Sequence, residues 1–285
     1  MGASAIKHIT VALDGSRASQ SAVRYACELA RSGASLSFCS LGNTQAAIGD
    51  DIPAADPTDT PERLGEICEA AVAQARALGI EADGHESRLH LAEAVVACAR
   101  EHASEVIVIG SDERRGLARL RASVGENLMR IADRPVIFVH ESDEYRGGDI
   151  AVTISGDDRS HLVLDAAIAI ALALDRKLFL ISEITLPTGV DYFAPGSNSD
   201  ARFIEATQRA STAGVKSGSA LGDGVGSIPS SLIELAERRD CAMIVTGLHD
   251  RSGLARMFTG SIAQQIVLEA HVPVGVVHHT FQPDR

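Results

Sequence analysis

The stretch that decides the fold reads Gly247-Leu-His-Asp-Arg-Ser-Gly-Leu-Ala-Arg-Met-Phe-Thr-Gly260-Ser261. It follows a short apolar run at 242–246, which is typical of a buried strand, and it precedes Ile262, where a helical pattern of apolar residues begins. Glycines and a hydroxyl group therefore lie where a strand ends and a helix begins. Free backbone N–H groups and the positive end of the helix face this point, and glycine lets an anion approach the backbone closely.

The chain contains the same arrangement a second time. An Arg-x-Gly-Leu-Ala-Arg pattern starts at Arg114 and again at Arg251, at the same distance from the preceding apolar run. In both places a further apolar run follows, beginning after Pro135 and after Pro273. A repeat of this length indicates two domains of one fold rather than a solenoid of small units. We predict domains at residues 1–142 and 148–285, separated by the polar stretch between them.

Each half alternates short apolar runs with Ala-rich amphipathic segments. This order predicts an α/β fold with two repeated doubly wound domains, each a five-stranded, mostly parallel sheet with helices on both faces. The strands are expected near 7–13, 35–41, 85–89, 105–109 and 136–139 in the first half, and near 150–154, 177–181, 215–220, 242–246 and 274–278 in the second.

These residues resemble the universal stress protein family in its tandem two-domain form, over nearly the whole chain. The family signature is Gly, two residues, Gly, nine residues, Gly and then Ser or Thr, with an early Asp at the end of the first strand. The resemblance implies a Rossmann-like fold of the adenine nucleotide alpha hydrolase type. It also implies that the loop holds the phosphates and ribose of ATP, and that the early Asp contacts the adenine end.

The C-terminal half keeps most of this loop but loses the early carboxylate, because Ser155 stands in its place. Asp250 replaces the second glycine, and its charge repels phosphate unless it turns outward or meets a metal ion, so the loop allows Mg²⁺ as a companion of ATP. His249 either donates a hydrogen bond to a phosphate or is an exposed loop residue. Our predicted nucleotide contacts here are Gly247, His249, Arg251, Gly260 and Ser261, with Ser155 facing the base or ribose.

The N-terminal half departs from the signature differently. Glu113 replaces the second glycine, the loop is one residue shorter, and Ala122-Ser123 stands where Gly-Ser is expected. Asp14, Gly110 and Ser123 form the secondary set of predicted contacts. An alternative for Asp14 is the N-cap of the next helix, which Ser16 can also supply.

Composition limits the class of protein. The formal net charge is −12, which argues against a general binder of nucleic acid or of anionic membranes. Five cysteines without a C-x-x-C pair favour reduced, buried thiols in a cytoplasmic protein. No apolar segment is long enough to span a bilayer. P-loop, nucleophile-elbow and zinc-protease motifs are absent from the sequence, so we predict no catalytic residue. The adjacent His278 and His279 would point to opposite faces of a strand and could not readily share a metal ion, so we predict no metal site.

What the resemblance implies is a stress-response regulatory protein that binds ATP in one domain, with the C-terminal one favoured, and acts through conformation or partners. An alternative is a nucleotide-free scaffold whose degenerate sites leave only an interaction surface. A third reading, a weak adenine-nucleotide hydrolase or adenylyl-transfer enzyme, lacks a visible catalytic base. The apolar strands at 136–139 and 274–277 predict, through the resemblance, an intramolecular pseudo-dimer of the two halves and leave a homodimer of the chain open.

Overall fold

A computed structural model describes residues 6–41, 61–87, 91–111, 122–141, 147–155, 160–182, 198–222, 227–248, 262–278 and 281. The chain divides into two compact units, one comprising residues 6–145 and the other residues 146–285 together with the first five residues. Each unit is described by itself below. The domain limits of 1–142 and 148–285 remain a prediction beside this division.

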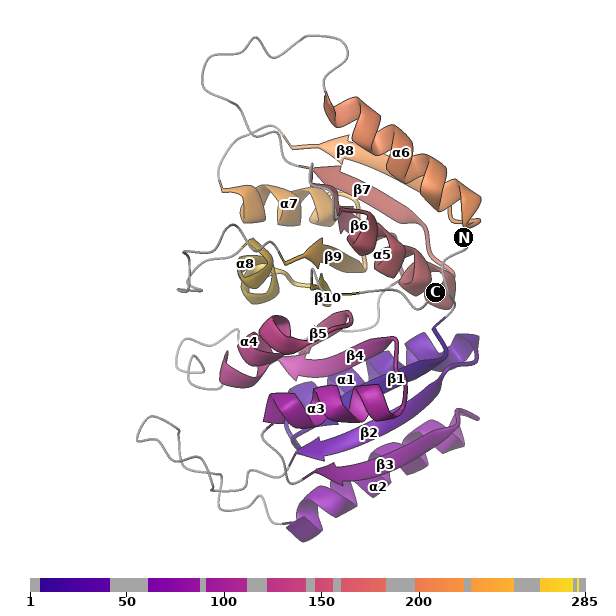
Figure 1. Cartoon of the computed structure of the whole chain (residues 1–285), viewed down its shortest axis with the longest axis vertical. Coiled ribbons are helices and arrows are strands. Elements are labelled where there is room, and N and C mark those ends of the chain that lie inside the picture. The colour runs from indigo at the N-terminus through magenta and orange to yellow at the C-terminus, as the bar shows by residue number, and fades with distance from the viewer. Residues whose placement is uncertain are drawn as a thin grey trace. The chain divides into compact units, whose positions relative to one another are not determined.

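The first unit alternates strands and helices from its first residues to its last (Figure 1). Its elements are β1 (His8–Leu13), α1 (Arg17–Leu29), the 3-10 turn η1 (Ala30–Ser32), β2 (Ser35–Leu41), α2 (Pro61–Ala77), β3 (Ala82–Ser87), α3 (Leu91–Glu101), β4 (Val106–Ser111), α4 (Ala122–Ile131) and β5 (Val136–His140). All strand pairs are parallel, in the order β3-β2-β1-β4-β5.

The second unit repeats this order. Its elements are β6 (Ile150–Thr153), α5 (Ser160–Leu174), β7 (Leu178–Ser182), α6 (Asn198–Thr212), β8 (Ser217–Leu221), α7 (Ile228–Glu237), β9 (Met243–Gly247), α8 (Ile262–Glu269) and β10 (Val274–Val277). Its strands are again all parallel, in the order β8-β7-β6-β9-β10. The predicted fold class of two repeated α/β domains with five parallel strands each is therefore confirmed.

The strand order places one topological switch point in each sheet. From β1 the chain moves outward through β2 to β3, and then crosses back to β4 on the other side of β1. Right-handed crossovers in opposite directions put their helices on opposite faces, so α1 and α2 cover one face while α3 and α4 pack together on the other (Figure 1). The switch points lie between β1 and β4 and between β6 and β9, where open α/β sheets bind ligands at the carboxyl edge.

Aliphatic side chains and a few phenylalanines fill the space between the sheets and their helices. The central strands of both sheets are buried on both faces, and Phe38, Ile107, Phe138 and Ile150 are among the largest fully buried side chains. All five cysteines are buried and free, which confirms the predicted buried thiols. Within the described residues, no helix combines the length and apolar character needed to cross a membrane.

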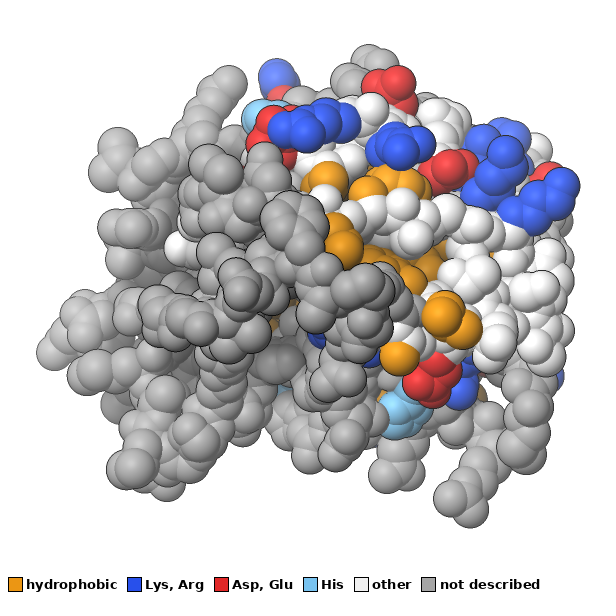
Figure 2. Space-filling view, turned by 90° about the horizontal axis from the view of Figure 1, so that it is seen from above, with side chains coloured by type: hydrophobic (Ala, Val, Ile, Leu, Met, Phe, Trp, Pro, Cys, Tyr) orange, Lys and Arg blue, Asp and Glu red, His pale blue; other side chains and the backbone are white. Residues whose placement is uncertain are grey.

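Both outer strands differ from their predicted positions. β3 comprises residues 82–87 rather than 85–89, and β8 comprises 217–221 rather than 215–220. Both strands end the order of their sheet and consist largely of small and polar residues, so apolar periodicity hardly marks them. Figure 2 looks onto the end of the second unit where β8 and α6 lie, and shows hydrophobic side chains bordered by Lys and Arg. Leu221 and Ile204 are the exposed large hydrophobic residues of these two elements.

Candidate functional site

The predicted site residue Asp14 lies directly after β1, at the switch point of the first unit. Its side chain is exposed, and its Oδ1 accepts a hydrogen bond from the Ser16 backbone N–H at 2.9 Å. Ser16 is the N-cap of α1, because its hydroxyl oxygen accepts from the Ser19 N–H at 3.1 Å. Gly15, with φ of +77°, makes the sharp turn between them. Ser16 therefore takes the capping role, and Asp14 presents a carboxylate to the solvent at the sheet edge.

Gly110 is the penultimate residue of the neighbouring strand β4 and lies at the same edge, since β1 and β4 pair with Ala12 opposite Ile109. A Cβ atom at this position would lie 2.4 Å from the backbone carbonyl carbon of Ala18 and the nitrogen of Ser19. No real Cβ approaches backbone this closely, so the first turn of α1 needs a glycine here. The contact of Gly110 with a nucleotide remains a prediction. The close packing of α1 on β4 is a second reason why this position holds a glycine.

In the second unit, Ser155 occupies the position that corresponds to Asp14. The Ser160 hydroxyl, at the first residue of α5, donates to the Ser155 carbonyl oxygen at 2.6 Å. The two hydroxyl oxygens are 2.7 Å apart. Because Ser160 has a single proton and gives it to the carbonyl, the Ser155 hydroxyl donates to Ser160. Ser155 thus closes the turn into α5 with its donor, and it carries no charge toward the sheet edge.

Gly247 ends β9 beside the end of β6, whose Val152 is paired with Val245. A Cβ atom here would lie 2.9 Å from Cγ2 of Val163 on α5, which is a side-chain atom rather than backbone. The Thr153 hydroxyl donates to the Thr246 hydroxyl oxygen at 3.0 Å and ties the two strands together just before they end. The fold therefore brings Ser155 and Gly247 to one edge, as it brings Asp14 and Gly110 to the corresponding edge of the first unit.

The remaining predicted contacts belong to the phosphate-binding loops. His249, Arg251, Gly260 and Ser261 lie outside the described residues. Ser123 belongs to α4, but its side chain is also outside the described part. Their roles in these loops remain predictions.

One histidine at the carboxyl edge was not among the residues predicted from the sequence. His140 is the last residue of β5, is 1% exposed, and its Nδ1 lies 3.1 Å from the Ser111 carbonyl oxygen at the end of β4. Since a carbonyl oxygen only accepts, Nδ1 carries the proton and donates. The repeat offers a signal for this position, because His278 follows β10 as His140 ends β5.

Comparison with known proteins identifies the same family for both halves. The model of the universal stress protein family matches residues 5–140 and 148–278. A universal stress protein of Mycobacterium tuberculosis strain H37Rv is 27% identical over 198 residues, which cover 62% of this chain and 63% of that protein. Another, from Methanocaldococcus jannaschii, is 28% identical over 138 residues, covering 45% of this chain and 80% of that protein. The match thus spans less than two thirds of the mycobacterial relative's length.

Solved structures show the same fold. A universal stress protein from Archaeoglobus fulgidus superposes with a TM-score of 0.69 at 16% identity, over 95% of this chain and 98% of that one. A universal stress protein solved in complex with cAMP covers 47% of this chain, with a TM-score of 0.39 and 22% identity. A universal stress protein from Archaeoglobus fulgidus in complex with dAMP covers 46% of this chain, with a TM-score of 0.34 and 21% identity.

Proposed function

We propose, since this chain belongs to the universal stress protein family, that it is a stress-response regulatory protein that binds ATP at the carboxyl edge of its C-terminal domain. Its output is a nucleotide-dependent conformation or partner rather than turnover. The observation that carries the proposal is the position of Gly247. It ends a central strand at the switch point and opens the segment that contains Gly260 and Ser261 at the family spacing.

Loop spacing supports the choice of domain, because the C-terminal loop keeps Gly247, Gly260 and Ser261 at the family spacing and the N-terminal loop is one residue shorter. Ser155 stands where the N-terminal domain has the exposed carboxylate of Asp14, so the C-terminal site lacks the contact that the resemblance assigns to the early Asp. The space where a side chain of Gly247 would stand is taken by Val163 of α5. The helix α8, which follows the loop, offers the free N–H groups of its first turn to an anion. Asp250 in the loop adds a negative charge, which Mg²⁺ bound with ATP would offset.

The test begins with nucleotide released on denaturation of freshly purified protein, followed by calorimetric titration of the same protein with Mg-ATP. We expect about one ATP per chain, the stoichiometry of one working site. Gly260→Glu should abolish this binding without unfolding the domain, because a carboxylate then occupies the phosphate position. Ala122→Glu, which places the same charge at the corresponding position of the N-terminal loop, is the matched control and should leave binding intact. Binding that survives Gly260→Glu would contradict the assignment.

A nucleotide-free scaffold is the second candidate, and two described features favour it. Gly110 is explained by its packing against α1, and the Ser155 hydroxyl is engaged with Ser160. Neither residue therefore requires a ligand to account for it. Absence of nucleotide in both the release and titration experiments would favour the scaffold, whose partners would then be sought by co-purification.

The assembly of the two halves remains a proposal from the family resemblance. We keep the division near residues 142–148, and the pairing of the halves as a pseudo-dimer within one chain. Light scattering of the full chain would distinguish a monomer of 29.9 kDa from a homodimer of twice that mass.

A further inference from the structure

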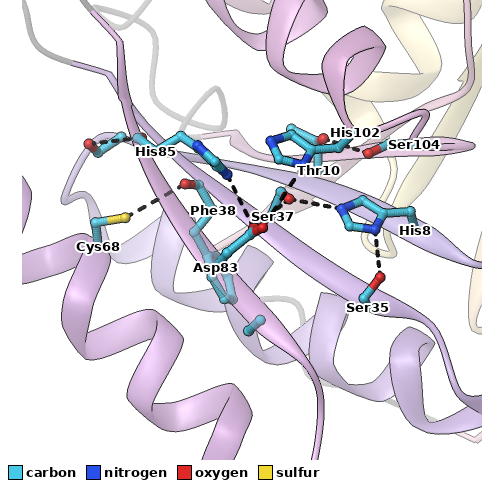
Figure 3. Close-up of polar contacts among 12 residues, drawn as sticks. His8, Thr10, Ser35, Ser37, Phe38, Cys68, Asp83, His85, His102 and Ser104 are labelled. Carbon is cyan, nitrogen blue, oxygen red and sulfur yellow. Dashed lines mark hydrogen bonds and ion pairs between the residues drawn. The ribbon is translucent and has the colours of Figure 1, made fainter.

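A group of histidines and one aspartate lies at the amino edge of the first sheet, opposite the edge where the strands end. His8 begins β1, Asp83 lies at the start of β3, and His102 follows the last residue of α3 (Figure 3). β2 lies between β1 and β3, and the register sets His8 opposite Ser35 and Ser37 opposite Asp83. Because α3 packs on β1 and β2, its end brings His102 over the same strands.

The potential ligand atoms of this group are close together. One ring nitrogen of His8, one of His102 and a carboxylate oxygen of Asp83 all lie within 4.8 Å of one another. His102 Nδ1 is 3.9 Å from Asp83 Oδ2, and the His8 and His102 rings stack with centroids 5.4 Å apart. His85 joins from β3, with its Nε2 at an ion-pair distance of 3.3 Å from Asp83 Oδ1 and its ring centroid 4.2 Å from that of His102.

Two ring nitrogens in this group are buried and make no hydrogen bond of good geometry among the described residues. One is Nε2 of His102, and the other is Nε2 of His85, whose contact is the 3.3 Å ion-pair approach to Asp83 Oδ1. Buried polar atoms in native proteins are almost always paired, so each exception needs a reason. Three imidazoles around one carboxylate, with unpaired nitrogens, are the donor set that a divalent transition metal ion takes up.

The surrounding hydrogen bonds fix the proton positions. The Ser37 hydroxyl donates to Asp83 Oδ1 at 2.6 Å, so its oxygen accepts from His8 Nε2 at 2.8 Å. His8 Nδ1 then accepts from the Ser35 hydroxyl at 2.5 Å. When Nε2 binds a metal ion instead, the proton moves to Nδ1, which donates to the Ser35 oxygen, and Ser35 donates to the Lys7 carbonyl oxygen 3.2 Å away. Both tautomers of His8 therefore have a partner.

The second domain shows that the fold does not require this group. The pairing rows Ile9–Leu36–Ala82 and Ile150–Leu178–Ser217 correspond, so Asp83 corresponds to Gly218 and His85 to Ala220. His102 precedes β4 by four residues as Arg239 precedes β9, and the Arg239 guanidinium lies 4.8 Å from the centroid of the Phe179 ring. His8 corresponds to Asp149, since Ile9 corresponds to Ile150. The same architecture is thus built without the three histidines and without a counterpart of Asp83 on the outer strand.

We propose that His8, Asp83 and His102, with His85 as a further ligand, bind a divalent first-row transition metal ion of the Zn²⁺ type. Tetrahedral Zn²⁺ with bonds of about 2.0–2.1 Å separates its ligand atoms by about 3.3 Å. The present atoms lie within 4.8 Å of one another, so they must approach by up to about 1.5 Å. Asp83 can supply part of this movement, because its side chain is 48% exposed and lies on the outer strand β3. The bound ion joins β1, β3 and the end of α3, which are far apart in the sequence.

The test uses the tag-free full chain, stripped of nucleotide and metal with chelator. Zn²⁺ is titrated by calorimetry, and Co²⁺ by its visible d–d absorption, which reports tetrahedral nitrogen and oxygen ligation. We expect one ion per chain, an intense Co²⁺ spectrum, and slower hydrogen exchange in the first domain on adding Zn²⁺. Mg²⁺ should compete poorly, because it prefers oxygen ligands.

Three variants decide the assignment. Asp83→Asn removes the charged ligand, and His102→Arg installs the residue that the second domain carries at this position, which provides a folded variant without the imidazole. Each should weaken Zn²⁺ binding at least tenfold and abolish the Co²⁺ spectrum, with circular dichroism unchanged. His271→Gln, which removes an exposed histidine of the second domain, is the control and should bind as the parent does. No stoichiometric binding in the parent, or equal binding in Asp83→Asn and His102→Arg, would overturn the proposal.

Discussion

Gly110→Ala adds one methyl group where α1 meets β4. The new Cβ would lie 2.4 Å from the backbone of Ala18 and Ser19, whereas carbon atoms pack at about 3.5–4.0 Å, so α1 must retreat by roughly 1 Å. Overpacking of this kind costs about 1–3 kcal/mol. The stiffer unfolded chain returns about 0.4–1 kcal/mol. We therefore expect the first domain to lose about 1–2 kcal/mol of unfolding free energy, or about 3–8 °C in Tm.

Gly247→Ala is the matched control in the second domain. Its Cβ would meet Cγ2 of Val163 at 2.9 Å, and a valine methyl group can move where a helix backbone cannot. The expected loss is below about 1 kcal/mol, because a small rotation of one side chain relieves the contact. The two variants add the same methyl group at equivalent positions of the repeat. Their difference therefore measures the clash with the α1 backbone, apart from the general effect of placing Ala near a strand end.

Hydrogen exchange measured by mass spectrometry reads the two domains separately, which a single melting curve of a two-domain chain does not. Gly110→Ala should accelerate exchange in α1 and leave α5 as in the parent. Gly247→Ala should change α5 only slightly. Equal protection of α1 in Gly110→Ala and the parent, or a larger effect from Gly247→Ala, would refute the argument that helix backbone occupies the space beside Gly110.

Three further outcomes follow from the described contacts. Ser16→Ala should destabilise the first domain by about 1 kcal/mol in urea unfolding, because it removes the N-cap of α1. Acidification from pH 8 should destabilise the first domain from about pH 6.5 downward, because the pKa of His8 is lowered in the folded protein and the unfolded chain therefore takes up this proton first. A second loss of stability, below about pH 4, is expected from Asp83, whose pKa is also lowered in the folded protein. His8→Gln should remove only the loss that begins near pH 6.5. The charged groups that act on His8 are His102, Asp83, Glu105 and Glu81. Burial raises the pKa of the Cys241 thiol to about 12, so this thiol should resist a disulfide reagent at pH 8 in the native protein and react after denaturation; fast native reaction would contradict its burial.

The sequence could predict the central part of each domain because parallel strands buried on both faces are continuous apolar runs. The repeat added the domain count, since Arg-x-Gly-Leu-Ala-Arg occurs at the same place in both halves. Outer strands carry no such run. β3 reads Ala-Asp-Gly-His-Glu-Ser, and only its hydrogen bonds to β2 define its limits. This is why the predicted position of β3 was three residues late at its start.

Local chemistry was also predictable at the turn after β1. A Ser and an Asp separated by one glycine can supply a helix N-cap and an exposed carboxylate. In the structure Ser16 is the N-cap of α1, and Asp14 is the exposed carboxylate. The second reason for Gly110 was not predictable, because the helix that fills the space beside it lies some ninety residues earlier in the chain. Sequence spacing identifies a glycine but not which neighbour requires its missing side chain.

The histidine group at the amino edge escaped prediction for a similar reason. Metal motifs are recognised when ligands recur at short spacing on one element, and His8, Asp83 and His102 come from three elements. Their meeting depends on strand order, because β1 and β3 flank β2, and on the length of α3, which ends above them. Comparing the halves position by position supplies the signal that motif searches lack. In the second domain, aspartate, glycine, alanine and arginine stand at the positions of His8, Asp83, His85 and His102, so the fold does not need the histidine group. Its cost in buried nitrogens without a hydrogen bond is then best explained by a ligand.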